Sequence, residues 1–278
     1  MLLHTVDVGP ADNPAQDRKT ARHHETAQDR NAAPHHKAPQ DHKAPPAHKT
    51  DRKTALLLHG LMGSSESWWR VIPVLADRGY RVLAMDLPGH GLSPRDPQLT
   101  VAKAASSVVE TLESLAVDRP VHAMGHSYGA TVLAAAAIDA EVTVYIDSAL
   151  SFAGGDDRAQ LTRRYAQDVL RRQDASWLRR SRPFYSSTDA EVEARAASRF
   201  DPATSASISC GDDVVLNPVP GSILVHAEPS AWVSDDDKRR FAERGVSVRG
   251  IRSAAHTVWY SHFEEFAASV PEVFGQYP

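Results

Sequence analysis

The pentapeptide Gly125-His126-Ser127-Tyr128-Gly129 contains the residue of this chain whose setting best suits nucleophilic chemistry. It follows the apolar stretch 121–124 and precedes the alanine-rich stretch 130–138, an order that predicts a strand, a tight turn and a helix. A serine in such a turn is strained and exposes its hydroxyl, and flanking glycines let strand and helix approach closely. The N-terminus of the helix directs free N–H groups toward a nearby oxyanion. We therefore expect Ser127 to be a nucleophile rather than part of a plain glycine-flanked turn.

A serine hydroxyl is a weak nucleophile at neutral pH, so Ser127 needs an adjacent base. His256 is the best candidate, because it lies in the segment Ser253-Ala254-Ala255-His256-Thr257, after the last predicted strand. The remaining histidines of the predicted domain fit this role less well, since they belong to other motifs, to predicted strands or to the start of the final helix. They are His59, His90, His122, His126, His226 and His262.

Length and charge limit the classes of function that this chain can have. With 278 residues it is long enough for one large domain or two small ones, and its formal net charge of -4 gives no reason to expect a nucleic-acid partner. It has no run of 18 apolar residues, so we expect no membrane span, and its N-terminus lacks the pattern of a signal peptide. The single cysteine, Cys210, excludes an intrachain disulfide. We expect a cytoplasmic protein.

Residues 1–53 differ in composition from the rest of the chain. They are rich in His, Lys, Asp, Ala and Pro, and short units recur, such as His35-His36-Lys37-Ala38-Pro39 and Asp41-His42-Lys43-Ala44-Pro45. Such a segment buries too little apolar surface to offset chain entropy, so we expect a disordered tail followed by a folded domain over 54–278. The histidines of the tail have no fixed ligand spacing, which favours a solvated segment over a weak metal-binding tract.

Strand and helix patterns alternate through the predicted domain. This alternation predicts an α/β fold with a doubly wound, mostly parallel sheet and right-handed crossovers. The expected strands are 55–58, 81–85, 121–124, 142–146, 223–226 and 246–251, and the expected helices are 69–78, 101–115, 130–138 and 263–270.

One stretch between two expected strands contains no convincing strand of its own. Residues 158–172 and 189–200 have helical patterns, and the whole insertion, about 150–210, is too long for a plain loop. Open α/β sheets bind ligands at the carboxyl ends of their strands. We therefore expect a helical cap over that edge, with ordinary peripheral helices as the alternative.

From Ala55 to Phe274 the chain resembles the α/β-hydrolase fold superfamily, in particular its single-domain serine esterases. The resemblance rests on four motifs in the family's order. They are His59-Gly60-Leu61, the segment Asp86-Leu87-Pro88-Gly89-His90-Gly91-Leu92-Ser93, the pentapeptide around Ser127, and the late His256. The family usually has antiparallel strands before the His-Gly strand, but the tail takes their place in this chain, so none is expected here.

The resemblance implies how Ser127 would work. The family places its catalytic histidine where this chain has His256. It builds its oxyanion hole from two backbone N–H groups, which here belong to Leu61 and Tyr128. It uses Asp86 in a structural turn rather than in chemistry.

The third member of a triad is a carboxylate that holds the base in the correct tautomer. Most of the family places it after the strand that is here 223–226, where this chain has Ser230 in the expected position. Other members place it after the preceding strand, where this chain has Asp147. We therefore expect Asp147 to be the acid, with Glu228 as the alternative.

These observations predict a cofactor-independent, carboxylesterase-like serine hydrolase acting on a small-molecule ester or related acyl compound through Ser127, His256 and Asp147. The same triad serves amide cleavage, carbon–carbon cleavage and acyl transfer, so these reactions remain open. A non-catalytic ligand-binding protein on the same scaffold is the other alternative, supported by the absent acid at Ser230. No phosphate-binding loop or metal-ligand cluster is visible in the predicted domain, so we expect neither a nucleotide nor a metal.

Overall fold

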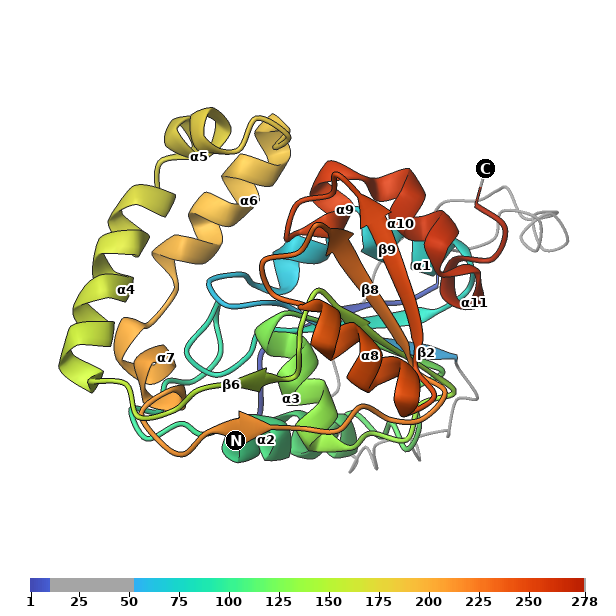
Figure 1. The fold of residues 1–278 in the computed structure, drawn as a ribbon, viewed down its shortest axis with the longest axis horizontal. Coiled ribbons are helices and arrows are strands. Elements are labelled where there is room, and N and C mark those ends of the chain that lie inside the picture. The colour runs from blue at the N-terminus through green and yellow to red at the C-terminus, as the bar shows by residue number, and fades with distance from the viewer. Residues whose placement is uncertain (11–52, 278) are drawn as a thin grey trace, which may run out of the picture.

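A computed structural model describes residues 1–10 and 53–277, which form one seven-stranded sheet with helices on both faces (Figure 1). The strand order is β1-β3-β2-β4-β5-β8-β9, and every neighbouring pair is parallel except β1 with β3. The strands are β1 (Thr5–Val8), β2 (Thr54–Leu58), β3 (Arg81–Met85), β4 (His122–His126), β5 (Val142–Ile146), β8 (Ile223–Glu228) and β9 (Ser247–Arg252). The predicted doubly wound α/β fold is therefore confirmed.

The sheet separates two hydrophobic cores because side chains alternate between its faces along each strand. In β2, Leu57 packs in the core on one face, whereas Leu56 and Leu58 pack in the core on the other. Helices α1 (Val71–Asp77) and α10 (Phe263–Ser269) cover the first face, together with the short helices η2 (Ser65–Trp68), α9 (Val258–Ser261) and α11 (Pro271–Phe274). Helices α2 (Val101–Ser114), α3 (Tyr128–Ala136) and α8 (Asp235–Glu243) cover the second. The central strands are buried on both faces, which explains their continuous apolar sequences.

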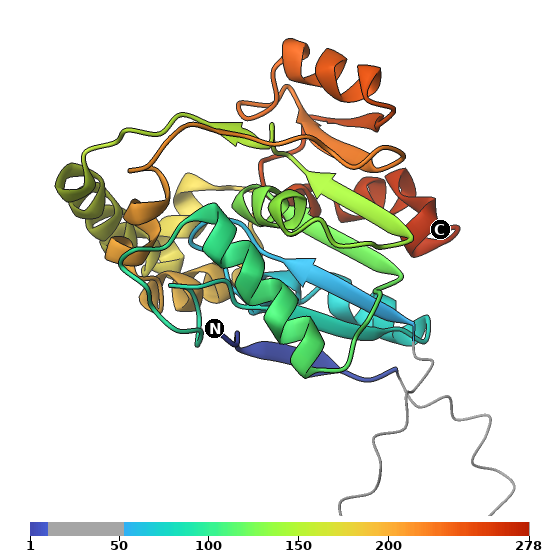
Figure 2. The same cartoon turned by 90° about the horizontal axis from the view of Figure 1, so that it is seen from below.

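The N-terminal residues correct two expectations. Residues 5–8 form the antiparallel edge strand β1, with Val8 paired to Val82, so residues 1–10 belong to the fold and an antiparallel strand does precede β2 (Figure 2). Leu3 is buried in one of the cores, and His4 donates its backbone N–H to Ser93. The strand was not predicted, because it has only four residues and the composition of residues 1–53 as a whole is of low complexity. The rest of the predicted tail, residues 11–52, lies outside the described residues.

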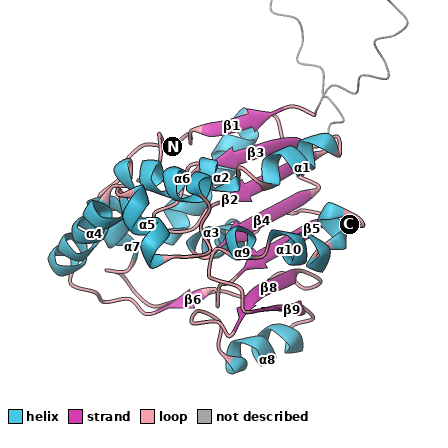
Figure 3. Ribbon diagram, turned by 90° about the horizontal axis from the view of Figure 1, so that it is seen from above, coloured by secondary structure: helices cyan, strands magenta, loops and turns pink. Residues whose placement is uncertain are grey.

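Four helices between β5 and β8 lie together at one end of the sheet (Figure 3). They are α4 (Arg158–Arg172), α5 (Ala175–Ser181), α6 (Ser187–Ser198) and α7 (Pro202–Ile208), and each begins after a side-chain N-cap, supplied by Asp157, Asp174, Ser186 and Asp201. Two short antiparallel strands that the sequence did not predict, β6 (Ser151–Phe152) and β7 (Val214–Val215), join this insertion to the sheet domain. In the described part of the chain, no helix has the length and apolar character needed to cross a membrane.

Two neighbouring leucines test whether the first ten residues are part of the folded domain. Leu3 is buried, whereas Leu2 is 58% exposed. We expect Leu3→Ala to lower the free energy of unfolding by about 2–3 kcal/mol, because it removes a buried side chain and leaves a cavity. Leu2→Ala should change it by no more than about 0.5 kcal/mol. Urea unfolding of the two variants measures the difference, and equal values would show that residues 1–10 do not pack on the sheet.

Candidate active site

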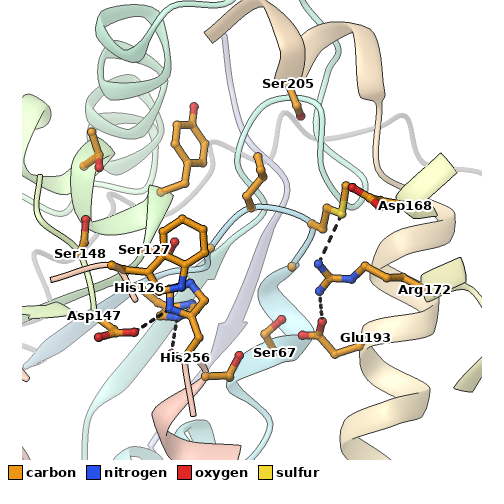
Figure 4. A pocket seen from close by; sticks show the side chains of 18 of the residues that line it. Ser67, His126, Ser127, Asp147, Ser148, Asp168, Arg172, Glu193, Ser205 and His256 are labelled. Carbon is orange, nitrogen blue, oxygen red and sulfur yellow. Dashed lines mark hydrogen bonds and ion pairs between the residues drawn. The ribbon is translucent and has the colours of Figure 1, made fainter. Parts of the chain in front are cut away.

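A cavity of about 580 Å³ lies where the carboxyl ends of the strands meet the helical insertion (Figure 4). Its lining includes the proposed nucleophile, base, acid and both oxyanion donors. These residues are Ser127, His256, Asp147, Leu61 and Tyr128. The structure thus brings together the five residues of the predicted triad and oxyanion hole, although they come from four separate parts of the chain.

Ser127 occupies a sharp turn between β4 and α3. Its backbone has φ 51° and ψ -118°, a conformation that is unfavourable for a residue with a side chain, and its N–H donates to the carbonyl of Ile146 at 2.8 Å. A Cβ on Gly125 would lie 2.6 Å from the Gly129 carbonyl oxygen, and one on Gly129 would lie 2.4 Å from the carbonyl oxygens of Leu58 and His59. The two glycines therefore allow strand and helix to meet closely enough to hold Ser127 in its strained turn.

His256 is held by a buried carboxylate. Its Nδ1 lies 2.7 Å from Oδ2 of Asp147, whose side chain is fully buried directly after β5. Because the carboxylate accepts a hydrogen bond at this distance, the contact selects the neutral tautomer in which Nδ1 carries the proton and Nε2 has a free lone pair. This is the tautomer that a general base requires.

Ser230 completes the environment of the carboxylate. Its hydroxyl donates to Asp147 Oδ1 at 2.7 Å and accepts the N–H groups of Trp232 at 2.9 Å and Val233 at 3.0 Å. The N–H of Ala227 also donates to Oδ1 at 3.1 Å. Since both acceptor sites of the Ser230 oxygen are taken, its hydrogen points at Asp147. The sequence marked Ser230 only as the residue that replaces an acid and gave no sign of this contact.

Glu228, the alternative acid, lies apart from this arrangement. It is the exposed last residue of β8 and is not among the residues that line the cavity. A Cβ on Gly250 would lie 2.9 Å from its Oε2, which places the carboxylate beside β9.

His126 supports His256 from a second side. Its Nε2 donates to the His256 backbone carbonyl at 2.9 Å, and the two rings lie 4.6 Å apart. Burial lowers the pKa of His126 well below its ordinary value, so the ring is neutral at physiological pH. The half-exposed ring of Trp232 lies 4.9 Å from the His256 ring. His256 is therefore fixed by aromatic contacts as well as by Asp147.

The loop after β2 lies against the turn that carries Ser127. A Cβ on Gly60 would lie 3.2 Å from the Ser127 Cβ, so Leu61 follows at the edge of the same cavity. His59 anchors this loop, because its Nε2 accepts the Leu87 N–H at 3.0 Å and its Nδ1 donates to the Gly60 carbonyl at 2.8 Å. Burial lowers the pKa of His59, which keeps the neutral form that both contacts need.

Asp86 lies outside the set of residues that line the cavity. Its carboxylate accepts the backbone N–H groups of Ser65 at 2.7 Å and Leu92 at 2.9 Å, and its Oδ2 lies 2.8 Å from His4 Nδ1. Asp86 thereby connects three segments of the chain, which contain His4, Ser65 and Leu92. Within residues 1–10 and 53–277, no group of three His, Cys, Asp or Glu side chains is arranged to hold a metal ion.

Comparison with known proteins agrees with this geometry. Residues 55–269 match a family model described as the alpha/beta hydrolase family. Among curated relatives, an acetyltransferase component of an acetoin-cleaving system from Cupriavidus necator is 37% identical over 106 residues, covering 38% of this chain and 28% of the relative. The esterase YbfF from Escherichia coli is 33% identical over 97 residues, covering 33% of this chain and 37% of the relative. The matches therefore span about a third of these relatives or less.

Solved structures extend the likeness over most of the chain. An esterase from Exiguobacterium antarcticum has a TM-score of 0.66 at 12% identity and covers 99% of this chain and 96% of its own. An esterase from Thermogutta terrifontis has a TM-score of 0.59 at 18% identity, covering 79% of this chain and 88% of its own. At these identities the likeness establishes the fold.

The close approach around Ser127 can be tested with two glycines. Gly129→Ala would push a methyl group into two backbone carbonyl oxygens, so we expect the variant to lose roughly 3 kcal/mol of unfolding free energy or to fail to fold. Gly211→Ala is the control, because a Cβ there meets nothing within 4 Å. Chemical denaturation compares the two, and a Gly129→Ala protein as stable as the control would contradict the packing described here.

Proposed function

The chain belongs to the alpha/beta hydrolase family, and on that premise we propose that it is a serine hydrolase that cleaves a carboxylic ester or a related acyl compound. The observation that carries the proposal is the buried Asp147 carboxylate at 2.7 Å from His256, in the cavity that Ser127 lines. A base of defined tautomer beside a serine on a strained turn is the arrangement needed to activate a hydroxyl.

The proposed reaction proceeds in two steps. In the first, His256 Nε2 takes the Ser127 hydroxyl proton as the oxygen attacks the substrate carbonyl, and the same proton then passes to the departing alcohol. In the second, His256 removes a proton from water as the water oxygen attacks the acyl-enzyme. The acyl–Oγ bond then breaks, the acid is released, and His256 returns that proton to Ser127. Asp147 remains ionised throughout and stabilises the imidazolium that forms in each step.

The negative charge on the substrate oxygen needs fixed donors. We assign them to the backbone N–H groups of Leu61 and Tyr128, two residues that line the same cavity as Ser127. Tyr128 is the first residue of α3, so its N–H has no partner within the helix and the helix dipole adds to its effect. Each such donor contributes on the order of 10²–10³ in rate.

Two alternatives are weighed by the same geometry. Amide cleavage, carbon–carbon cleavage and acyl transfer use the same triad, and we favour ester hydrolysis because several of the similar solved structures are described as esterases. The alternative of a non-catalytic ligand-binding protein was supported by the serine at position 230, where most of the family has the acid. That support is weakened, because the carboxylate contact to His256 is supplied by Asp147 instead.

The assignment of the acid is tested by two amide substitutions. We expect Asp147→Asn to lower kcat for p-nitrophenyl ester hydrolysis by about 10³–10⁴, because the amide no longer stabilises the imidazolium and favours the wrong tautomer. Glu228→Gln is the matched control and should leave kcat within about twofold, as its carboxylate lies outside the cavity. Both variants should unfold at the wild-type temperature. A large loss in Glu228→Gln with an active Asp147→Asn protein would reverse the assignment.

The hydroxyl of Ser230 should matter through Asp147. Ser230→Ala removes one of the hydrogen bonds to the ionised carboxylate, and such bonds are worth about 1.5–3 kcal/mol. We expect kcat to fall roughly tenfold or more with little change in KM, and Ser230→Thr, which keeps the hydroxyl, to recover part of the loss. Steady-state kinetics on the same ester distinguishes this outcome from an unchanged kcat, which would show that the contact does not support catalysis.

A further inference from the structure

Arg182 lies in the turn between α5 and α6 and lines the same cavity as Ser127. Its backbone is fixed at both ends, because its N–H donates to the Leu178 carbonyl at 2.8 Å and its carbonyl accepts the Tyr185 N–H at 2.9 Å. The turn therefore holds the side chains of Arg182 and Tyr185 side by side.

The guanidinium of Arg182 is held by aromatic rings rather than by acids. Its central carbon lies 5.7 Å from the centre of the Trp177 ring and 5.5 Å from that of Tyr185. Burial raises the pKa of Tyr185, so the phenol is neutral and supplies no counter-charge. Within residues 1–10 and 53–277, the side chain makes no hydrogen bond or ion pair, and its Nη1 is buried without a partner.

The acids of the cap that line the cavity have other arginines nearby. Figure 4 shows Arg172, Glu193 and Asp168 across the cavity from Ser127, with Glu193 paired to Arg172. Asp168 lies 3.9 Å from Arg171. Neither carboxylate forms an ion pair with Arg182, so the cap side of the cavity carries a guanidinium without a counter-ion.

An unpaired, partly desolvated guanidinium is costly in a folded protein unless a ligand supplies the missing acceptor. Contacts with two aromatic rings also restrict the movement of the guanidinium, whose planar set of N–H donors suits the two oxygens of a carboxylate. Arg182 and Ser127 line one cavity of about 580 Å³. An anion bound at Arg182 therefore lies in the same cavity as the proposed nucleophile.

We propose that Arg182 is a specificity-determining residue that binds a carboxylate on the substrate, so that the protein prefers esters carrying a second, free carboxyl group. This inference rests on the proposed ester hydrolysis and adds the chemical class of the substrate. The carboxylate stays intact during the reaction, and its contact with Arg182 orients the ester toward Ser127.

Paired substrates test the preference on both sides of the scissile bond. On the acyl side, mono-p-nitrophenyl adipate and pimelate are compared with neutral p-nitrophenyl alkanoates of the same chain length. On the alcohol side, ω-carboxyalkyl butyrates are compared with plain alkyl butyrates in a pH-stat. We expect kcat/KM to favour the carboxylated member by about tenfold or more in at least one series, and the preference to shrink as salt is raised.

Three variants assign that preference to one guanidinium. Arg182→Gln should remove it by raising KM for the carboxylated ester, with the neutral ester unaffected, and Arg182→Lys should keep part of it. Arg180→Gln is the control, because Arg180 lies in α5, two residues before Arg182, and its side chain is 68% exposed. It should behave as wild type. Thermal unfolding and the rate of Ser127 labelling by a fluorophosphonate should be the same in all three variants, which excludes a collapsed cap.

The outcomes separate this inference from the function on which it rests. Wild-type protein that is labelled at Ser127 but prefers neutral esters in both series would overturn the role of Arg182 and leave the hydrolase intact. A preference that survives in Arg182→Gln would do the same. Folded protein that neither reacts with the fluorophosphonate nor hydrolyses any of the esters would overturn both proposals.

Discussion

The hydrogen bond between the buried Asp147 carboxylate and His256 is the constraint on which the rest of the site depends. A fully buried carboxylate is tolerated only when its oxygens are satisfied, and here one oxygen faces His256 while the other accepts from Ser230 and the Ala227 backbone. Asp147 lies directly after β5, and its supporting donors lie in the neighbouring strand β8, for Ala227, and just after it, for Ser230. The parallel pairing of these two strands therefore sets the position of His256, the proposed base.

The proposed nucleophile, Ser127, is positioned by a second constraint, which is steric. Gly125 and Gly129 bring β4, α3 and the end of β2 into contact distances that no other residue permits. This packing holds Ser127 in a conformation that costs free energy, and the buried layers on both faces of the sheet supply the stability that offsets it. The rigidity of the sheet therefore maintains the strained backbone of Ser127, which a loop without this core would not keep.

The sequence predicted the features that depend on local pattern. Strands 81–85 and 142–146 have the expected bounds, because a continuous apolar run is typical of a strand buried on both faces. The sequence did not predict β1, because its four residues adjoin a long polar tract. It also did not predict β6 and β7, which are too short to show periodicity. The sequence also did not predict the contacts of Ser230 and Arg182, because both sets of contacts depend on residues that only the fold brings together.

Mass spectrometry of the reacting protein tests the role of Ser127. When wild-type protein is mixed with p-nitrophenyl butyrate and quenched in acid within milliseconds, we expect one butyryl group per chain on the peptide that contains Ser127. We expect no adduct in Ser127→Ala and much slower formation in Asp147→Asn. Turnover of the ester with no adduct on Ser127, or with an adduct on another residue, would show that Ser127 is not the nucleophile.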